Sequence, residues 1–112
     1  VAVWQLERLA AQRTAFVRAA AAVRAGAGGA PCLVLTGNVP QAIWYTRCHA
    51  WPSWGPPDDT MLATYPHVFL LEAAGQVRQP DAATLVRPGL RWRTVACGER
   101  PAWCVHEAER AP

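Results

Sequence analysis

The segment from Cys32 to Cys48 constrains the fold of this chain more than any other stretch. It opens with the apolar run Cys32–Leu35, which has no polar alternation and is therefore typical of a strand buried on both faces of a parallel sheet. A Thr-Gly-Asn turn follows, in which Asn38 is a suitable N-cap and forms a capping-box-like pair with Gln41. The segment therefore predicts a strand, a tight turn and a helix that runs to about Arg47.

The strand and the helix of this segment have matched lengths, which bears on the cysteines at its two ends. A strand over 32–36 rises about 13 Å at ~3.3 Å per residue, and a helix over 39–47 descends about 13 Å at ~1.5 Å per residue. Cys48 therefore returns beside Cys32, and we predict a disulfide between them. Cys97 and Cys104 fall on neighbouring strands of a predicted hairpin, so we predict that they pair as well, although spacing alone does not determine connectivity.

Free thiols and metal ligands are the other two roles open to four cysteines in a chain of this size. No Cys-x-x-Cys pair occurs, and the pairs Cys48-His49 and Cys104-x-His106 are poor zinc spacings, so we expect no metal site. A reactive thiol needs a basic or helix-N-terminal setting, whereas Cys48 follows a helix C-terminus. Two disulfides would place the domain outside the cytoplasm.

The remainder of the chain alternates predicted helices and strands. Apolar residues at three- and four-residue spacing predict one amphipathic helix over 5–25, and these residues are Leu6, Leu9, Phe16, Ala20 and Val23. Further on we expect a Pro- and Trp-rich loop over 49–59, a short helix through 64, strands over 67–73, 90–97 and 102–108, and one or two helical turns from Asp81. This order predicts a single α/β domain over 1–112, a small layered domain with a mostly parallel sheet, a long N-terminal helix and a C-terminal antiparallel hairpin.

Composition and charge narrow the classes of protein. The chain is 52% hydrophobic and 17% charged, which is typical of a globular domain. All eleven basic residues are arginines, but the net charge is only +3 and no dense arginine stripe appears, so we expect no nucleic-acid partner. No window is apolar for the roughly 18 residues that a membrane span needs. Residues 1–5 are either the end of a preceding membrane helix or part of ordinary helix packing.

Four residues are candidates for contact with a ligand or a partner. Asn38 lies in a turn at the carboxyl end of a predicted strand, where α/β sheets bind ligands, but the turn lacks both nucleotide-binding glycine motifs. Trp51 and Trp54 either stack on a sugar or a partner, or fold over an open sheet edge. Arg47 either complements the helix dipole or contacts an anionic headgroup. The nearby Trp44 is expected in the core.

The acidic and histidine residues do not form a catalytic pattern. Asp58 and Asp59 are adjacent, so their side chains point apart, and a helix cap explains them better than an acid/base pair. His49, His67 and His106 are scattered, with no defensible order of serine, histidine and aspartate around them. We therefore predict no catalytic residue and no cofactor in this segment.

A family resemblance rests on the long arginine-bearing helix, on the pattern Cys-apolar-apolar-apolar-Thr-Gly-Asn-Val-Pro-Gln-x-x-Trp-Tyr-x-x-Cys at 32–48, and on Gly-x-x-Arg-Gln-Pro at 75–80. With these motifs the chain resembles the C-terminal soluble domain of bacterial, especially actinobacterial, multi-pass membrane glycosyltransferases. The class in question depends on polyprenol-phosphate sugars and is similar to the protein mannosyltransferases. The resemblance runs from Leu6 to Pro80, and from Leu90 onward the chain matches only in pattern.

The resemblance implies an α/β domain on the extracytoplasmic side of a bacterial cell membrane, after the final membrane helix. Its partners would be the membrane-embedded part of the same polypeptide and a glycan or a polyprenol-phosphate sugar. The catalytic acidic residues of this class lie near the N-terminus of the full protein, and none maps onto this chain. The resemblance therefore implies a non-catalytic accessory domain that helps to shape the acceptor site.

Two other functions are compatible with the residues alone. A stand-alone secreted or membrane-anchored binding module would also use two disulfides and an aromatic loop. A cytoplasmic thiol enzyme would instead keep all four cysteines reduced.

Overall fold

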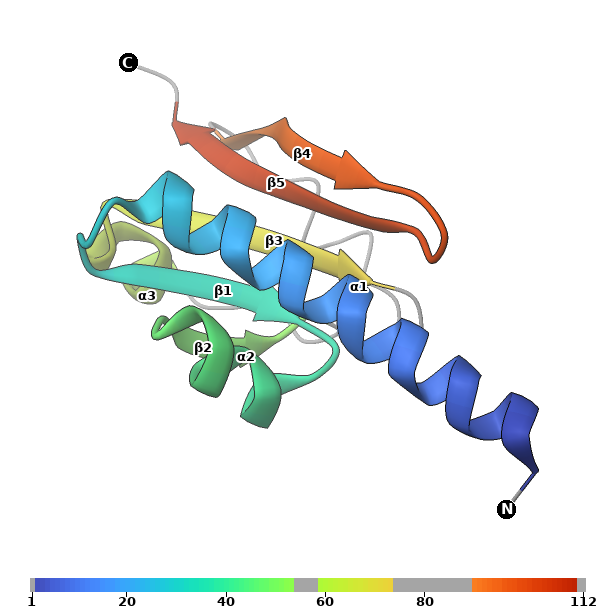
Figure 1. The fold of residues 1–112 in the computed structure, drawn as a ribbon. Coiled ribbons are helices and arrows are strands. Elements are labelled where there is room, and N and C mark those ends of the chain that lie inside the picture. The colour runs from blue at the N-terminus through green and yellow to red at the C-terminus, as the bar shows by residue number, and fades with distance from the viewer. Residues whose placement is uncertain (1, 54–58, 74–89, 111–112) are drawn as a thin grey trace.

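The computed structural model describes residues 2–53, 59–73 and 90–110 (Figure 1). Its elements are, in order, α1 (Val3–Ala27), β1 (Cys32–Thr36), α2 (Val39–Thr46), β2 (His49–Pro52), α3 (Asp59–Thr64), β3 (His67–Ala73), β4 (Leu90–Gly98) and β5 (Trp103–Arg110). Trp54, Asp58, the Gly-x-x-Arg-Gln-Pro motif at 75–80 and the predicted helical turns from Asp81 lie outside the described residues. None of the helices in the described part is long and apolar enough to cross a membrane.

The five strands form one mixed sheet in the order β2-β1-β3-β5-β4. β1 pairs in parallel with β2 and with β3, whereas β5 is antiparallel to both β3 and β4. The predicted α/β class, with a parallel portion and a C-terminal antiparallel hairpin, is therefore confirmed.

The edge strand β2 corrects the expectation of a loop over 49–59. Residues 49–52 pair with β1 in the register Leu33↔His49 to Thr36↔Pro52. β1 and β2 can form these parallel backbone hydrogen bonds although β2 contains a proline, because Pro52 is the last residue of an edge strand. Trp51 is therefore part of the sheet and does not belong to a loop.

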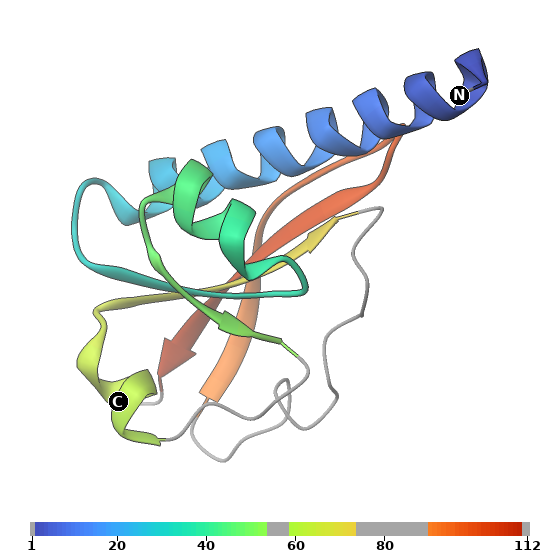
Figure 2. The same cartoon turned by 90° about the horizontal axis from the view of Figure 1, so that it is seen from below.

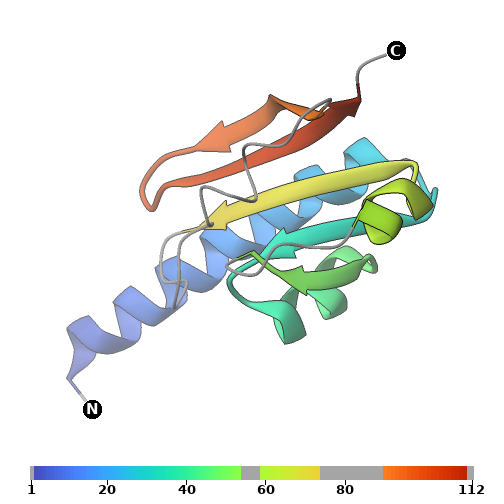
Figure 3. The ribbon, with the colours of Figure 1, turned by 180° about the vertical axis from the view of Figure 1, so that it is seen from behind.

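Helices cover both faces of the sheet. Figure 1 shows α1 crossing one face, and Figure 3 shows α3 on the other face with α1 behind the strands. Under α1 lies a cluster that includes Val34, Phe69, Leu71 and Val105. The opposite face of the same strands contributes Leu33, Leu35, Val68 and Leu70, together with Leu62 of α3. Both faces of β1 are buried, which is why its sequence does not alternate.

Small residues let α1 lie close to the sheet. Ala15, Ala19, Ala20 and Ala27 are all buried on the side of α1 that faces the strands. A Cβ atom at Gly26 would lie 2.9 Å from a ring carbon of Phe69, so this position has no room for a larger side chain. The helix then ends at Gly28, whose φ of 60° is the left-handed conformation that glycine adopts without strain.

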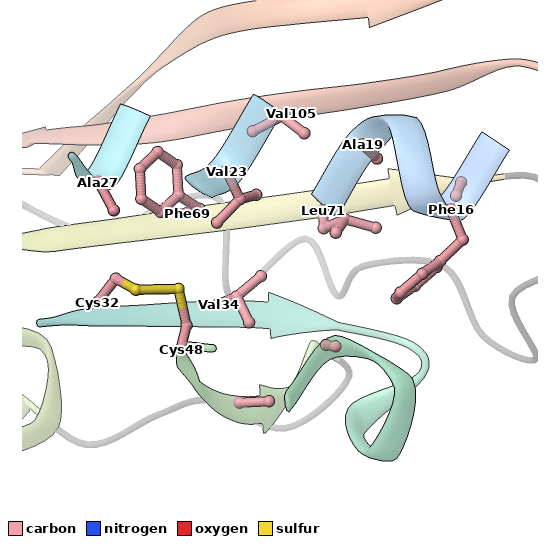
Figure 4. Packing of buried hydrophobic residues seen from close by; sticks show 13 residues of the cluster. Phe16, Ala19, Val23, Ala27, Cys32, Val34, Cys48, Phe69, Leu71 and Val105 are labelled. Atoms are coloured by element: carbon pink, nitrogen blue, oxygen red, sulfur yellow. A yellow bond between two sulfur atoms is a disulfide. The ribbon is translucent and has the colours of Figure 1, made fainter. Parts of the chain in front are cut away.

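Both predicted disulfides are present. Cys32 and Cys48 are bonded with their Cα atoms 4.9 Å apart, and this bond lies beneath the C-terminal half of α1 (Figure 4). Cys97 and Cys104 are bonded across β4 and β5, where they occupy directly opposite positions. No free cysteine remains. Two disulfides indicate an oxidising location outside the cytoplasm.

Two predictions about apolar residues are wrong. Trp44 was expected in the core and is 66% exposed, because α2 turns residues 39, 42, 45 and 46 toward its neighbours and leaves the opposite side in solvent. Leu6 and Leu9 were expected on the buried stripe of the first helix, but the burial of α1 begins only at Ala15. The reason is that the helix is longer than the sheet it covers (Figure 2).

Candidate functional site

The N-terminal part of α1 extends past the sheet as an isolated helix (Figures 1 and 2). We call residues 3–12 of α1 the projecting segment. Its large apolar side chains are mostly exposed, with 61% of Trp4 and 60% of Leu9 accessible to solvent, and Val3 and Leu6 are exposed as well. A globular domain gains nothing from such exposure, so the segment is suited to contact with another apolar surface.

All the exposed large hydrophobic residues of the described chain belong to α1 or α2. Five are on α1, namely Val3, Trp4, Leu6, Leu9 and Val17, and the other two are Ile43 and Trp44 of α2. Both helices lie on the same face of the sheet (Figure 2). The described part of the molecule therefore has an apolar helical side, whereas the opposite side exposes no large hydrophobic residue.

The charges of α1 accompany this apolar surface. The helix contains four arginines, at positions 8, 13, 18 and 24, and one acidic residue, Glu7. Arginine carries a long apolar stem and a permanent positive charge, so it suits a boundary between an apolar phase and anionic groups. The projecting segment exposes Leu6 and Leu9 on one side of the helix, while Trp4 and Arg8, four residues apart, lie together on another side.

The predicted contact residue Asn38 lies in the turn between β1 and α2, where neighbouring residues already form hydrogen bonds with it. Its backbone N–H donates to Oγ1 of Thr36 at 3.2 Å, and its Nδ2 donates to Oε1 of Gln41 at 2.7 Å. The Asn38 side chain thus binds the expected partner, Gln41, but it does not cap the backbone of α2, which corrects the capping prediction. The same turn is tied to β2, because the backbone N–H of Ser53 donates to the Thr36 carbonyl at 3.0 Å.

The three predicted contact residues that the structure describes, Asn38, Arg47 and Trp51, are not gathered in one place. Trp51 is opposite Leu35 near the carboxyl end of β1, close to Asn38 in the register, and it packs half-buried against the cluster under α3. Arg47 follows the last residue of α2 and precedes Cys48, which is bonded to the first residue of β1. Arg47 therefore lies at the opposite end of β1 from Asn38. The structure does not describe Trp54.

Arg47 is instead associated with Trp44, on the outer side of α2. Its guanidinium carbon lies 5.4 Å from the centre of the Trp44 ring, a cation–π contact between two exposed side chains. Sequence reasoning missed this pair because it assigned Trp44 to the core. Their i, i+3 spacing was the available signal.

His67 and His106 belong to two polar networks on the antiparallel part of the sheet, whereas His49 on β2 is hydrogen-bonded to Tyr65. His67 Nδ1 donates to Glu107 Oε2 at 2.7 Å, and Arg93 donates to the other oxygen of that carboxylate at 3.1 Å. These partners are 40 and 14 residues apart in the chain, so no local motif could reveal them. Each carboxylate oxygen has a partner, which gives this network a stabilising role between β3, β4 and β5.

The second network joins Thr94, His106 and Glu72 on three neighbouring strands. Oγ1 of Thr94 and Nδ1 of His106 are hydrogen-bonded at 3.0 Å, and Nε2 of His106 is 3.6 Å from a carboxylate oxygen of Glu72. A nucleophile, a base and an orienting acid stand in this order in hydrolases, but the second distance exceeds that of a hydrogen bond. Thr94 and His106 are also directly opposite in the β4–β5 register, so a cross-strand pair explains their contact.

Within the described ranges, no three His, Cys, Asp or Glu side chains gather in a way that could hold a metal ion. The surface of the described residues is marked instead by exposed apolar and arginine side chains on α1 and α2. Comparisons of the chain with protein-family models, with curated proteins and with solved structures found no match.

Proposed function

We propose that this chain is a membrane-proximal, extracytoplasmic accessory domain of a bacterial membrane glycosyltransferase that uses polyprenol-phosphate sugars. The domain has no catalytic role of its own, and its partner is the membrane-embedded part of the same polypeptide. The observation that supports this proposal most strongly is the apolar, arginine-bearing projecting segment of α1. The two disulfides and the resemblance of residues 32–48 to that class of enzymes support it further.

The projecting segment gives the domain a way to rest against a membrane or a membrane helix. Burying a large apolar side chain contributes about 1.5–3 kcal/mol, and Leu6 and Leu9 are three residues apart on one side of a helix that is already formed, so both can be buried against one surface. Tryptophan prefers the interfacial region of a bilayer, where its ring is apolar and its N–H remains hydrated. Arg8 and Arg13 can then extend toward anionic headgroups.

Vesicle binding tests the role of the projecting segment. We expect the oxidised chain to co-sediment with vesicles of phosphatidylcholine and phosphatidylglycerol, and the triple variant Trp4→Ser, Leu6→Ser, Leu9→Ser to remain in solution. The double variant Ile43→Ser, Trp44→Ser is the matched control, because it removes exposed apolar side chains from α2 and should bind like the wild type. Equal binding by the triple variant and the wild type would contradict a membrane-contacting projecting segment.

The gene that encodes this chain tests the link to sugar transfer. We expect several hydrophobic spans upstream of the codon for Val1, and the full-length product in membranes should transfer sugar from a labelled polyprenol-phosphate donor. Inside that product, the triple variant in α1 should lower transfer, while the single variant Ile43→Ser in α2 should not. A cleavable signal peptide directly upstream would exclude this proposal and favour a stand-alone secreted binding module.

A further inference from the structure

A hollow of about 560 Å³ lies between the C-terminal ends of α1 and α2, at the other end of α1 from the projecting segment. Apart from Thr46, Arg24 and Arg47, the described residues that line it are alanines, glycines and Cys32. None of these lining residues is acidic. The hollow therefore combines a small, apolar floor with two permanent positive charges.

The two arginines differ from Arg93 in their partners. Arg93 is paired with the carboxylates of Glu107 and Glu109 at 3.1 and 3.0 Å. Arg24 and Arg47 are exposed, and no ion pair joins either of them to a carboxylate of the described chain. The donors of both guanidinium groups are thus available to a ligand.

The backbone of Arg47 supplies an independent observation. It adopts a φ of 63° at the C-cap of α2, while α1 uses Gly28 with a φ of 60° at the same position. A left-handed conformation is easy for glycine and costly for arginine, so stability alone favours glycine at both caps. The variant Arg47→Gly therefore tests whether this position requires the arginine side chain. The guanidinium carbon of Arg47 lies 5.4 Å from the centre of the Trp44 ring, which helps to hold the side chain in place.

The C-terminal dipoles of the two helices do not cancel this positive charge. Helix C-termini are partly negative because their last carbonyl groups lack partners. Here the carbonyl of Arg24 accepts the N–H of Gly28, and the carbonyl of Ile43 accepts the N–H of Arg47, both at 3.1 Å. Each helix C-terminus still corresponds to about −0.5 elementary charge, so the two together offset about half of the charge of two guanidinium groups and leave a net positive charge.

We propose that this hollow binds the phosphate group of a phosphorylated sugar. A pair of arginines is the common protein partner of phosphate, and the volume has room for a sugar ring beside it. The choice of a water-soluble or polymer-linked sugar rests on the proposed function. Arg24 is 20 residues along α1 from Trp4, which corresponds to about 30 Å, so the hollow and the projecting segment are separate regions of the same helix.

Titration of the oxidised chain in the absence of membranes tests this proposal. The probes are glucose 1-phosphate and inorganic phosphate, with glucose and chloride at matched ionic strength as controls, and the readout is the amide NMR signals of Gly28 and Gly29. We expect both phosphates to shift these signals and glucose to leave them unchanged. The variant Arg24→Gln, Arg47→Gln should bind at least tenfold more weakly, whereas Arg13→Gln, Arg18→Gln removes the same charge from elsewhere on α1 and should bind like the wild type.

Two results would overturn the proposal. The first is a failure of the titrations, in which neither phosphate shifts the signals of Gly28 and Gly29, or both double variants lose the same affinity. An equal loss in the two variants would indicate a nonspecific charge effect. The second is a dependence of phosphatidylglycerol-vesicle binding on Arg24 and Arg47 without any response to the soluble phosphates, which would identify a lipid headgroup as the ligand. Because the titrations contain no membrane, their failure is distinct from a failure of the vesicle experiment.

Discussion

The two halves of α1 contain similar residues and lie in opposite environments. In the C-terminal half, Phe16 is 4% exposed and Val23 is fully buried against the sheet. In the N-terminal half, Leu9 lies two helical turns before Phe16 on the same stripe and is 60% exposed. The helix itself is continuous through both halves. The difference shows that an amphipathic pattern predicts an apolar stripe on a helix. How much of that stripe is buried within the domain depends on the length of the sheet beneath it.

The largest expected difference in stability is between two variants that each truncate one apolar residue, one in each half of α1. Phe16→Ala should lower the free energy of unfolding by about 3–5 kcal/mol, because it leaves a cavity under α1. Leu9→Ala should change it by less than about 0.5 kcal/mol, because the side chain is already in solvent. Urea unfolding of the oxidised protein measures both values. Similar losses for the two variants would mean that the projecting segment is covered in solution.

The disulfide under the buried half should contribute the next largest amount. Replacing Cys32 and Cys48 by alanine should lower the free energy of unfolding by about 3 kcal/mol, because the bond closes a loop of 16 residues in the unfolded chain. The same change at Cys97 and Cys104, whose separation is 7, should cost about 2.5 kcal/mol. Thermal unfolding of the two variants gives this order. Thiol counting on the denatured, unreduced wild type should find no free thiol, and four thiols would contradict both bonds.

A methyl group tests how closely the buried half approaches the sheet. Alanine normally stabilises a helix by about 1 kcal/mol relative to glycine. At Gly26, however, the new Cβ would press on the Phe69 ring, at a typical cost of 1–3 kcal/mol. We therefore expect Gly26→Ala to lower stability by about 1 kcal/mol, while Thr14→Ala on the exposed side of α1 raises it by a few tenths. A stabilised Gly26→Ala variant would show that the ring moves away freely.

The smallest expected effect concerns the two helix ends. Arg47→Gly should raise the free energy of unfolding by about 0.5 kcal/mol. The left-handed conformation destabilises an arginine by ~1–2 kcal/mol, and glycine removes this strain. The same change loses a cation–π contact that contributes about 0.5–1 kcal/mol. Gly28→Ala should lower stability by about 1 kcal/mol at the equivalent cap of α1. Chemical unfolding distinguishes the two signs. A destabilised Arg47→Gly variant would show that the arginine is present for stability.

Local patterns predicted those features that depend on neighbouring residues. The strand over 67–73 is observed with the predicted bounds, and the matched strand and helix lengths between Cys32 and Cys48 correctly indicated a disulfide. Both followed from residue spacing and from the dimensions of regular structure. The edge strand β2 escaped prediction, because a stretch that contains histidine, tryptophan and proline joins a sheet only when a neighbouring strand offers a free edge.

The candidate sites were predictable only in part. Arg47 was singled out by type and position, but its partner Trp44 was assigned to the core, since a helix of eight residues does not reveal which side will be covered. The network of His67, Glu107 and Arg93 joins residues from three strands, and only the register between those strands brings them together.

By itself, the sequence predicted the order of the described helices and strands apart from β2, and it indicated both disulfides, because these depend on spacings within single segments or hairpins. Only the tertiary structure decided which apolar residues of α1 and α2 remain in solvent, and that the ends of two helices form a hollow with two arginines. The physical reason is that exposure and concavity are properties of packed neighbours. A helical stripe has the same period whether or not a sheet lies beneath it.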